Sequence, residues 1–187
     1  MNKGFYVDIG CYHPTKGSLT NYLYTYQKWN GLNVDLSRIS IDLFKLSRPR
    51  DLNINAAITN FDGETHYFEN GIINQQNSLD NKNKNKVKIK AYTLNSLLEN
   101  FKIEQIDYLN IDAEGHDYTI ITKFNFSKFK PKVISIEHNS YDVEDLLNSK
   151  THDLIISNRY FLASKFGVTC IYVDTKFKNE IDTLMSV

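Results

Sequence analysis

Short apolar runs alternate with amphipathic segments along this chain, and that alternation constrains its fold more than any other feature. Residues 5–9 form a β-branched and aromatic run that ends at Gly10, which predicts a strand entering a turn. Further strands are predicted at 32–35 and 52–58, with helices at 18–30 and 38–46 between them. Strand, helix, strand, helix, strand is typical of a parallel α/β unit.

The two predicted helices carry apolar side chains at helical spacing, which predicts one buried stripe on each. Ser18 is a suitable N-cap for the first helix, and Asn30-Gly31 is expected to end it. The stripe residues are Leu19, Tyr22, Leu23 and Tyr26 on the first helix and Ile39, Leu43 and Leu46 on the second.

The alternation continues in the second half of the chain. Strands are predicted at 63–69, 87–92, 108–112, 132–137, 153–157 and 169–174, and helices at 94–100, 115–123 and 143–148. Only residues 158–168 separate the last two strands, too few for a crossover through a full helix, so we expect an antiparallel hairpin at the sheet edge. The sequence therefore predicts an α/β fold with a mostly parallel sheet and a single domain over residues 1–187.

The Asn- and Lys-rich stretch from Asn70 to Lys86 interrupts this pattern. One interpretation is a solvated connector, because polar low-complexity tracts rarely pack. The other is a substrate loop, since a loop of this length inside a domain is often functional and residues 74–78 offer hydrogen-bonding groups.

Charge and composition exclude several classes of protein. Lys+Arg and Asp+Glu both number 22, so no overall field attracts nucleic acid or an anionic membrane. We see no apolar run long enough to span a membrane and no signal-peptide core near the N-terminus. Cys11 and Cys170 form neither a disulfide framework nor a metal-binding pair. These features predict a cytoplasmic protein in a reducing compartment.

Acidic residues stand at the ends of the predicted central strands. Asp35, Asp112 and Glu137 each close a strand, and Asp8 precedes the glycine that ends the first. In a parallel sheet these ends share one edge, where ligands bind. Asp35 is placed to accept hydrogen bonds from ribose hydroxyls. The first turn lacks G-x-G-x-x-G, which disfavours NAD and FAD and favours a nucleoside cofactor without phosphates.

Four motifs stand out along the chain: Val-Asp-Ile-Gly at 7–10, Asn-Val-Asp at 33–35, Tyr-Leu-Asn-Ile-Asp-Ala-Glu-Gly-His-Asp at 108–117 and Ile-Ser-Ile-Glu-His at 134–138. Together with residues 94–98 they resemble the FkbM family of S-adenosylmethionine-dependent methyltransferases. Cys-Tyr-His-Pro at 11–14 and Arg-Pro-Arg-Asp at 48–51 resemble one branch of that family. The resemblance extends from about residue 5 to 173. It implies a Rossmann-like, seven-stranded methyltransferase fold and methyl transfer, usually to a hydroxyl of a small polar acceptor such as a sugar, a glycan precursor or a secondary metabolite.

The resemblance also implies roles for individual residues. The residues that it places at the cofactor are Asp8, Gly10, Cys11, Tyr12, Asp35, Ala56, Ala57 and Asp112. Asp8 would orient the first loop, Gly10 would allow close backbone approach, and Asp35 would hold the ribose. The alanines would lie against adenine. Those placed around the acceptor hydroxyl, as catalytic candidates, are Asp112, Glu114 and His138.

Each assignment has a simpler alternative. Asp8 could cap the next helix, and Asp35 could be a solvated acid at the end of a strand. Asp112 and Glu114 could satisfy the N–H groups of a helix N-terminus. His138 could be a half-buried histidine with no catalytic task. A hydroxyl is also activated by Mg²⁺, for which Asp112, Glu114 and Glu137 could supply oxygen ligands. We favour no metal site, because no D-x-D cluster is present.

Two other functions compete with small-molecule O-methylation. RNA 2′-O-methylation would require a lysine where Glu137-His138 stands, and zero net charge argues against binding a phosphate backbone. A non-catalytic binding module is the other, because few residues precede the first strand to cover an acceptor. Acceptor recognition is then expected from residues 70–86, the hairpin or a second subunit of a homo-oligomer, to which Tyr24 or Trp29 would contribute.

Overall fold

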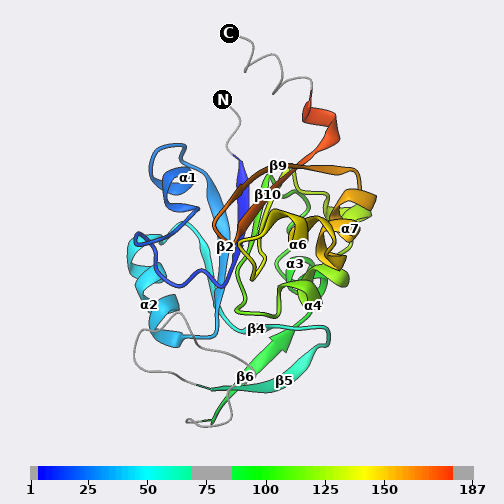
Figure 1. The fold of residues 1–187 in the computed structure, drawn as a ribbon. Helices are drawn as coiled ribbons and strands as arrows, with labels where there is room; N and C mark the ends of the chain where they lie inside the picture. The colour runs from blue at the N-terminus through cyan, green and yellow to red at the C-terminus, as the bar shows by residue number, and fades with distance from the viewer. Residues whose placement is uncertain (1–3, 69–85, 179–187) are drawn as a thin grey trace.

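The computed structural model describes residues 4–68 and 86–178 and contains a central seven-stranded sheet in the order β3-β2-β1-β7-β8-β10-β9 (Figure 1). Its strands are β1 (Phe5–Ile9), β2 (Asn30–Asp35), β3 (Leu52–Asn55), β7 (Tyr108–Ile111), β8 (Val133–Glu137), β9 (Tyr160–Phe166) and β10 (Thr169–Asp174). The first five strands in this order pair in parallel, whereas β10 is antiparallel to both β8 and β9. The mostly parallel α/β sheet with an antiparallel edge hairpin is therefore confirmed.

Helices cover both faces of this sheet. On one side lie α1 (Asn21–Thr25) and α2 (Arg38–Ser47) (Figure 1). The other side holds α3 (Leu94–Asn100), α4 (Asp117–Thr122), α6 (Val143–Leu147) and α7 (Lys150–Ser157). A short α5 (Phe126–Phe129), which the sequence pattern did not predict, precedes β8. The two-sided cover explains why both faces of the central strands are buried, even where they carry the polar side chains of Asp8, Asn33, Asn110 and Ser135.

The main core lies between the central strands and the helices α3 and α4. Val7, Leu32, Leu109 and Ile134 come from four neighbouring strands, and each has 0% of its surface exposed. Burial of such side chains contributes roughly 1.5–3 kcal/mol each to folding. A rigid sheet of this kind fixes the positions of the loops that follow its strands.

The strand predicted at 153–157 is wrong, because these residues belong to α7. The side chain of Ser149 accepts a hydrogen bond from the backbone N–H of His152 and caps the helix, and Ile155 buries its side chain in the core. The predicted edge hairpin exists, but its first strand is β9. An apolar run of this length fits a helix or a strand equally well, and here the N-cap at Ser149 favours the helix.

The apolar stripe predicted for the first helix is also wrong. Helix α1 has five residues, none of them buried, and Tyr22 and Tyr26 are 59% and 69% exposed. Gly31 belongs to β2, where a Cβ would lie 2.1 Å from the ring of Tyr6. It is therefore a close-approach glycine rather than a helix stop.

Helix α2 is confirmed, but it buries a different face from the predicted one. Ile41 and Phe44 are fully buried, whereas Leu46 is 81% exposed. The helix begins at Arg38 behind Ser37, whose side chain accepts a hydrogen bond from the backbone N–H of Ser40. This start places Ile41 and Phe44 towards the sheet.

The strand predicted at 52–58 consists of two strands in different sheets. The chain leaves β3, passes Ala56 and enters β4 (Ala57–Ile58), which pairs with β6 (Lys86–Tyr92) and through it with β5 (Gly63–Phe68). This three-stranded sheet lies below the main sheet in Figure 1. The substrate-loop hypothesis for residues 70–86 concerns, apart from Lys86, residues outside those that the structure describes.

Candidate functional site

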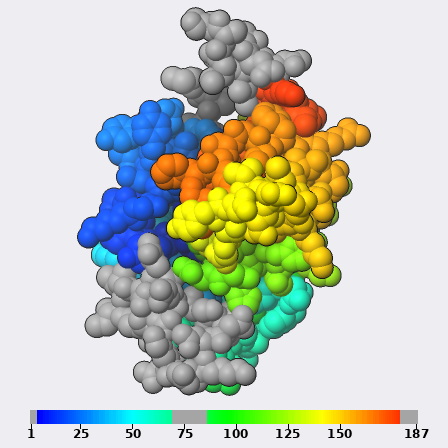
Figure 2. Space-filling view, in the orientation of Figure 1, coloured from blue at the N-terminus to red at the C-terminus, as the bar shows by residue number. Residues whose placement is uncertain are grey.

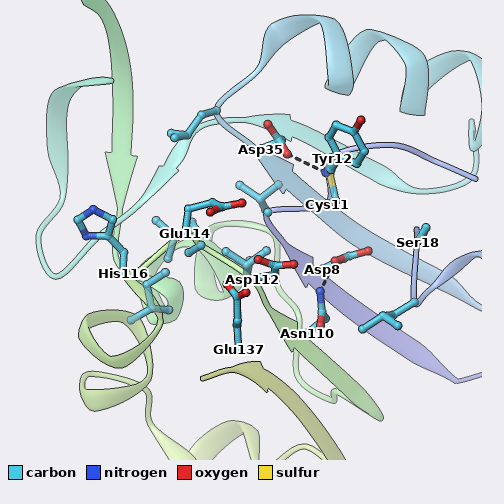
Figure 3. Close-up of a pocket in the computed structure, with 18 of the residues that line it drawn as sticks. Asp8, Cys11, Tyr12, Ser18, Asp35, Asn110, Asp112, Glu114, His116 and Glu137 are labelled. Carbon is cyan, nitrogen blue, oxygen red and sulfur yellow. Dashed lines mark hydrogen bonds between the residues drawn. The ribbon is translucent and has the colours of Figure 1, made fainter. Parts of the chain in front are cut away.

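A cavity of about 320 Å³ opens where β1, β2, β7 and β8 end. Pockets for small ligands start at about this volume. Among its lining residues five carry carboxylates: Asp8, Asp35, Asp112, Glu114 and Glu137 (Figure 3). The space-filling view shows the N-terminal segment, in blue, beside later segments in green, yellow and orange (Figure 2). The strand ends thus bring together residues distant in the sequence, as parallel topology requires.

The turn after β1 forms the floor of this pocket. Gly10 has φ +75°, and a Cβ at this position would lie 1.7 Å from the backbone oxygen of Asp112. Only glycine permits this approach of the β1 turn to the end of β7. Cys11 is buried against Ile41 and Phe44 of α2, and burial raises the pKa of its thiol well above the usual value.

Asp8 is buried, and each of its carboxylate oxygens accepts a hydrogen bond. Its Oδ2 accepts from the hydroxyl of Thr20 at 2.7 Å, and its Oδ1 accepts from the side-chain amide of Asn110 at 2.9 Å. Asn110 accepts in turn from the hydroxyl of Ser135 at 2.5 Å. Burial raises the pKa of Asp8, which these hydrogen bonds partly oppose. Asp8 therefore ties the loop before α1 to β7.

Asp35 is the last residue of β2, and its carboxylate holds two backbone segments, the loop after β1 and the start of the turn before α2. Its Oδ2 accepts from the N–H of Tyr12 at 2.8 Å, drawn as a dashed line in Figure 3, and its Oδ1 accepts from the N–H of Ser37 at 2.7 Å. Burial raises the pKa of Asp35 to about 6 despite these bonds. Each carboxylate oxygen has a second lone pair, so the group can accept further hydrogen bonds from a ligand.

Three carboxylates crowd the other side of the pocket. Asp112, Glu114 and Glu137 surround the same part of the cavity in Figure 3. Although the side chain of Asp112 is exposed to the cavity, desolvation by the pocket walls and the charges of Glu137, Asp117 and Glu114 raise its pKa to about 8. Glu114 adopts φ +48°, an uncommon conformation for this residue. A group that titrates near neutral pH beside like charges is a candidate for proton transfer.

The turn that carries Asp112 and Glu114 is braced by Asp117. The two oxygens of this buried carboxylate accept from the N–H groups of Ala113 at 3.0 Å and Gly115 at 3.2 Å. Asp117 thus satisfies the free N–H groups of the turn before α4. The simpler interpretation of the sequence assigned this role to Asp112 and Glu114. Those two side chains line the cavity instead.

The structure brings most of the predicted site residues together. Those lining the cavity are Asp8, Gly10, Cys11, Tyr12, Asp35, Ala56, Asp112 and Glu114. Two are placed elsewhere. Ala57 packs in the core of the small sheet with Tyr67 and Ile89. His138 follows β8, and its Nε2 lies 3.1 Å from Oδ2 of Asp145 on α6. The described residues that line the cavity do not include His138.

Sequence reasoning missed several lining residues. Gly17, Ser18 and Leu19 form one wall, although the pattern assigned Ser18 and Leu19 to a helix. The motif at 108–117 contains Asn110, but the pattern predicts no role for its side chain. The sequence predicts Glu137 as a strand-end acid and a possible metal ligand, and the structure adds it to the lining of the cavity. Its position beside Asp112 follows from the pairing of β7 with β8.

The described residues show two further features. None of their groups of His, Cys, Asp and Glu side chains is arranged to hold a metal ion. None of the helices in residues 4–68 and 86–178 is long and apolar enough to cross a membrane.

Comparison with known protein families identifies a family model that covers most of the chain. The family model described as the methyltransferase FkbM domain matches residues 8–162, a range that includes every lining residue of the pocket. No curated protein and no solved structure matches the chain.

Proposed function

The chain belongs to the FkbM family of methyltransferase domains, and from this premise we propose that it transfers the methyl group of S-adenosylmethionine to a hydroxyl oxygen of a small polar acceptor. The proposed acceptors are sugars, glycan precursors or secondary metabolites. The observation that carries the proposal is the position of Asp35. It closes β2 at the rim of the cavity, where a carboxylate can accept hydrogen bonds from both ribose hydroxyls.

The chemistry of the lining residues fits this cofactor. Leu36, Ala56 and Ile58 offer apolar surface beside Asp35 for an adenine ring. The described residues that line the cavity include no lysine or arginine, which suits a nucleoside without phosphates. The carboxylates also suit the positive sulfonium and ammonium groups of S-adenosylmethionine.

The cofactor, when bound, supplies an electrophilic methyl group on a positively charged sulfur. The protein has to orient the acceptor and remove its hydroxyl proton. A positioned base contributes typically about 10²–10⁴-fold to such a step. We assign this base to Asp112, because a pKa of about 8 makes its ionised form a much better proton acceptor than an ordinary aspartate.

The neighbours of Asp112 have separate roles in this proposal. Burial raises the pKa of Asp112 most, and the negative charge of Glu137 raises it further. Glu114, held at the cavity by its turn, accepts a hydrogen bond from the acceptor. We assign no proton transfer to His138, because the described residues that line the cavity do not include it.

Thermal unfolding with added ligands tests the cofactor assignment. S-adenosylmethionine or S-adenosylhomocysteine at 100 times its Kd stabilises the folded state by about 2.7 kcal/mol, and roughly 5–10 °C in Tm is expected for a domain of this size. NAD should give no shift. Asp35→Ala should abolish the shift, whereas Asp42→Ala, at an exposed carboxylate paired with Lys45 on α2, should preserve it.

Release of S-adenosylhomocysteine in the presence of a panel of sugars and other hydroxyl compounds then tests the reaction. Turnover with any of these acceptors supports the proposal. Binding without turnover on any acceptor would instead indicate a module that retains the cofactor site. A well-folded protein that responds to neither methionine-derived nucleoside would overturn the proposal.

A further inference from the structure

Arg48 is buried beneath the loop that forms one wall of the pocket. It caps the C-terminus of α2 and has only 1% of its surface exposed. Its guanidinium carbon lies 4.8 Å from the ring centre of Phe44 and 5.6 Å from that of Tyr24. A charge at such a depth requires several hydrogen-bond partners, because an unpaired one would strongly destabilise the fold.

Most of the partners of Arg48 belong to one loop. Its Nη2 donates to the backbone oxygen of Pro14 and to the hydroxyl of Ser18 at 2.8 Å. Its Nη1 donates to the hydroxyl of Thr20 at 2.8 Å and to that of Tyr6 on β1 at 3.3 Å. One planar group therefore holds three points of the segment 14–20, and Ser18 among them lines the cavity.

Thr20 extends this arrangement to the floor of the pocket. Its hydroxyl accepts from Arg48 and donates to Asp8, which also accepts from Asn110. The positive charge of Arg48 partly offsets the burial that raises the pKa of Asp8. Arg48, Thr20, Asp8 and Asn110 thus connect α2, the loop, β1 and β7 in one buried chain of hydrogen bonds.

The segment has little apolar anchoring of its own. Helix α1, which follows it, contributes no buried residue, and Leu19 is 50% exposed. Pro14 and Thr20 are buried, and both are bonded to Arg48. The guanidinium is therefore the main fixed point between residues 14 and 20.

We propose that Arg48 is a positioning residue for the cofactor: its guanidinium holds residues 14–20 in the conformation that completes the pocket wall. This inference rests on the proposed S-adenosylmethionine site and adds a residue that does not line the cavity. A lysine would keep the charge, but its single ammonium cannot reach the two sides of the loop that the guanidinium fork joins.

The first test compares Arg48→Lys with Asp51→Asn. Asp51 belongs to the same buried region, where it accepts from the hydroxyl of Tyr6, the N–H of Gly31 and the amide of Asn33. Both variants should lower Tm. Titration calorimetry should show S-adenosylhomocysteine binding weakened about tenfold or more in Arg48→Lys and changed less than about threefold in Asp51→Asn. Equal weakening in the two variants, or none in Arg48→Lys, would overturn the inference.

A second measurement needs no ligand. Amide hydrogen exchange in Arg48→Lys should accelerate at residues 15–20 relative to the central strands, whereas Asp51→Asn should leave that ratio near the wild-type value. Unchanged exchange would contradict the inference. If the wild-type protein fails to bind S-adenosylhomocysteine, the proposed function fails, while the exchange result still decides whether Arg48 holds the loop.

A loop-side variant covers the case in which Arg48→Lys does not fold. Ser18→Ala removes one of the acceptors of Arg48 at a half-buried site. It should weaken S-adenosylhomocysteine binding by a few-fold and accelerate exchange at neighbouring amides. Wild-type affinity and wild-type exchange in Ser18→Ala would overturn the inference.

Discussion

The two sides of the pocket use their carboxylates in different ways. On the side of β1 and β2, both oxygens of Asp8 and of Asp35 accept hydrogen bonds from fixed donors. On the side of β7 and β8, Asp112 faces the like charges of Glu137 and Glu114, and the Oε2 atom of Glu137 is buried without a hydrogen-bond partner in the described part of the chain.

This difference separates a binding surface from a reactive one. Carboxylates whose oxygens are hydrogen-bonded hold the backbone in place and remain ionised at lower cost. Crowded carboxylates bind protons more readily, because one ionised group disfavours ionisation of the next. We therefore assign cofactor binding to the first side and proton transfer to the second, and the following predictions test that division.

The largest effect is expected where the two sides touch, at Gly10. In Gly10→Ala the new Cβ would meet the backbone oxygen of Asp112 and the residue would keep φ +75°, so we expect a loss of more than about 3 kcal/mol in the free energy of unfolding. Gly17→Ala is the matched control, because Gly17 also has positive φ (+67°) but nothing within 4 Å of its Cβ position. Urea unfolding should show a loss of only about 1–2 kcal/mol there.

Neutralising one carboxylate on each side should affect the free energy of unfolding differently. Asp8→Asn replaces an acceptor of two hydrogen bonds by an amide that can accept only at one end, and it should destabilise the fold by about 1–3 kcal/mol. Asp112→Asn relieves repulsion and should leave stability equal or higher at pH 8. Urea unfolding of both variants measures this. A similar loss in both would contradict the division.

The free energy of unfolding should depend on pH because of the carboxylates on the side of β7 and β8. The pKa of Asp112 is raised to about 8 in the folded state, so the folded state binds this proton more tightly than the unfolded chain does. Its contribution to stability is full below pH 4 and is lost as the pH rises through about 8. Between pH 6 and 9 the wild-type free energy of unfolding should therefore fall more steeply than that of Asp112→Asn.

A smaller shift is expected in the pH profile of activity. Asp112 has to be ionised to accept a proton, so kcat/KM should rise through a pH near 8, displaced by any bound cationic cofactor. Glu137→Gln removes the neighbouring charge that raises the pKa of Asp112 most, and it should move the rise to lower pH. Glu114→Gln should move it less, because the charge of Glu114 has a smaller effect on Asp112. An unchanged profile in Glu137→Gln would contradict the role given to that residue.

The smallest effect is expected at His138. The described lining of the cavity does not include this residue, so His138→Gln should keep kcat within about threefold of the wild-type value, far less than the loss expected for Asp112→Asn. Release of S-adenosylhomocysteine measures both. A loss in His138→Gln as large as that in Asp112→Asn would move the proton acceptor from β7 to the end of β8.

The sequence predicted the parts of the fold that depend on strong local patterns. Strand β1 and helix α3 occur at the predicted residues, because a glycine ends the first and Thr93 caps the second. The prediction of a strand at 153–157 is wrong, because Ser149 caps a helix that includes these residues. The apolar stripe of residues 19–26 failed for another reason, since its side chains are not covered by the described parts of the chain.

Long-range contacts explain what sequence could not supply for the site. The acids at the strand ends were placed correctly along the chain, but the crowding of Asp112 by Glu137 depends on strand pairing. The role inferred for Arg48 depends on a loop 28 to 34 residues away in sequence. The sequence marks Arg48 only as part of the Arg-Pro-Arg-Asp motif at 48–51, whereas the buried hydrogen bonds show which loop it holds.

A crystal structure of the protein with S-adenosylhomocysteine would show which residues hold the ribose, the adenine and the sulfur. We expect both ribose hydroxyls within hydrogen-bond distance of Asp35, adenine beside Ala56 and Ile58, and the sulfur facing Asp112. A ligand bound elsewhere, or bound in this pocket with its ribose away from Asp35, would contradict this assignment.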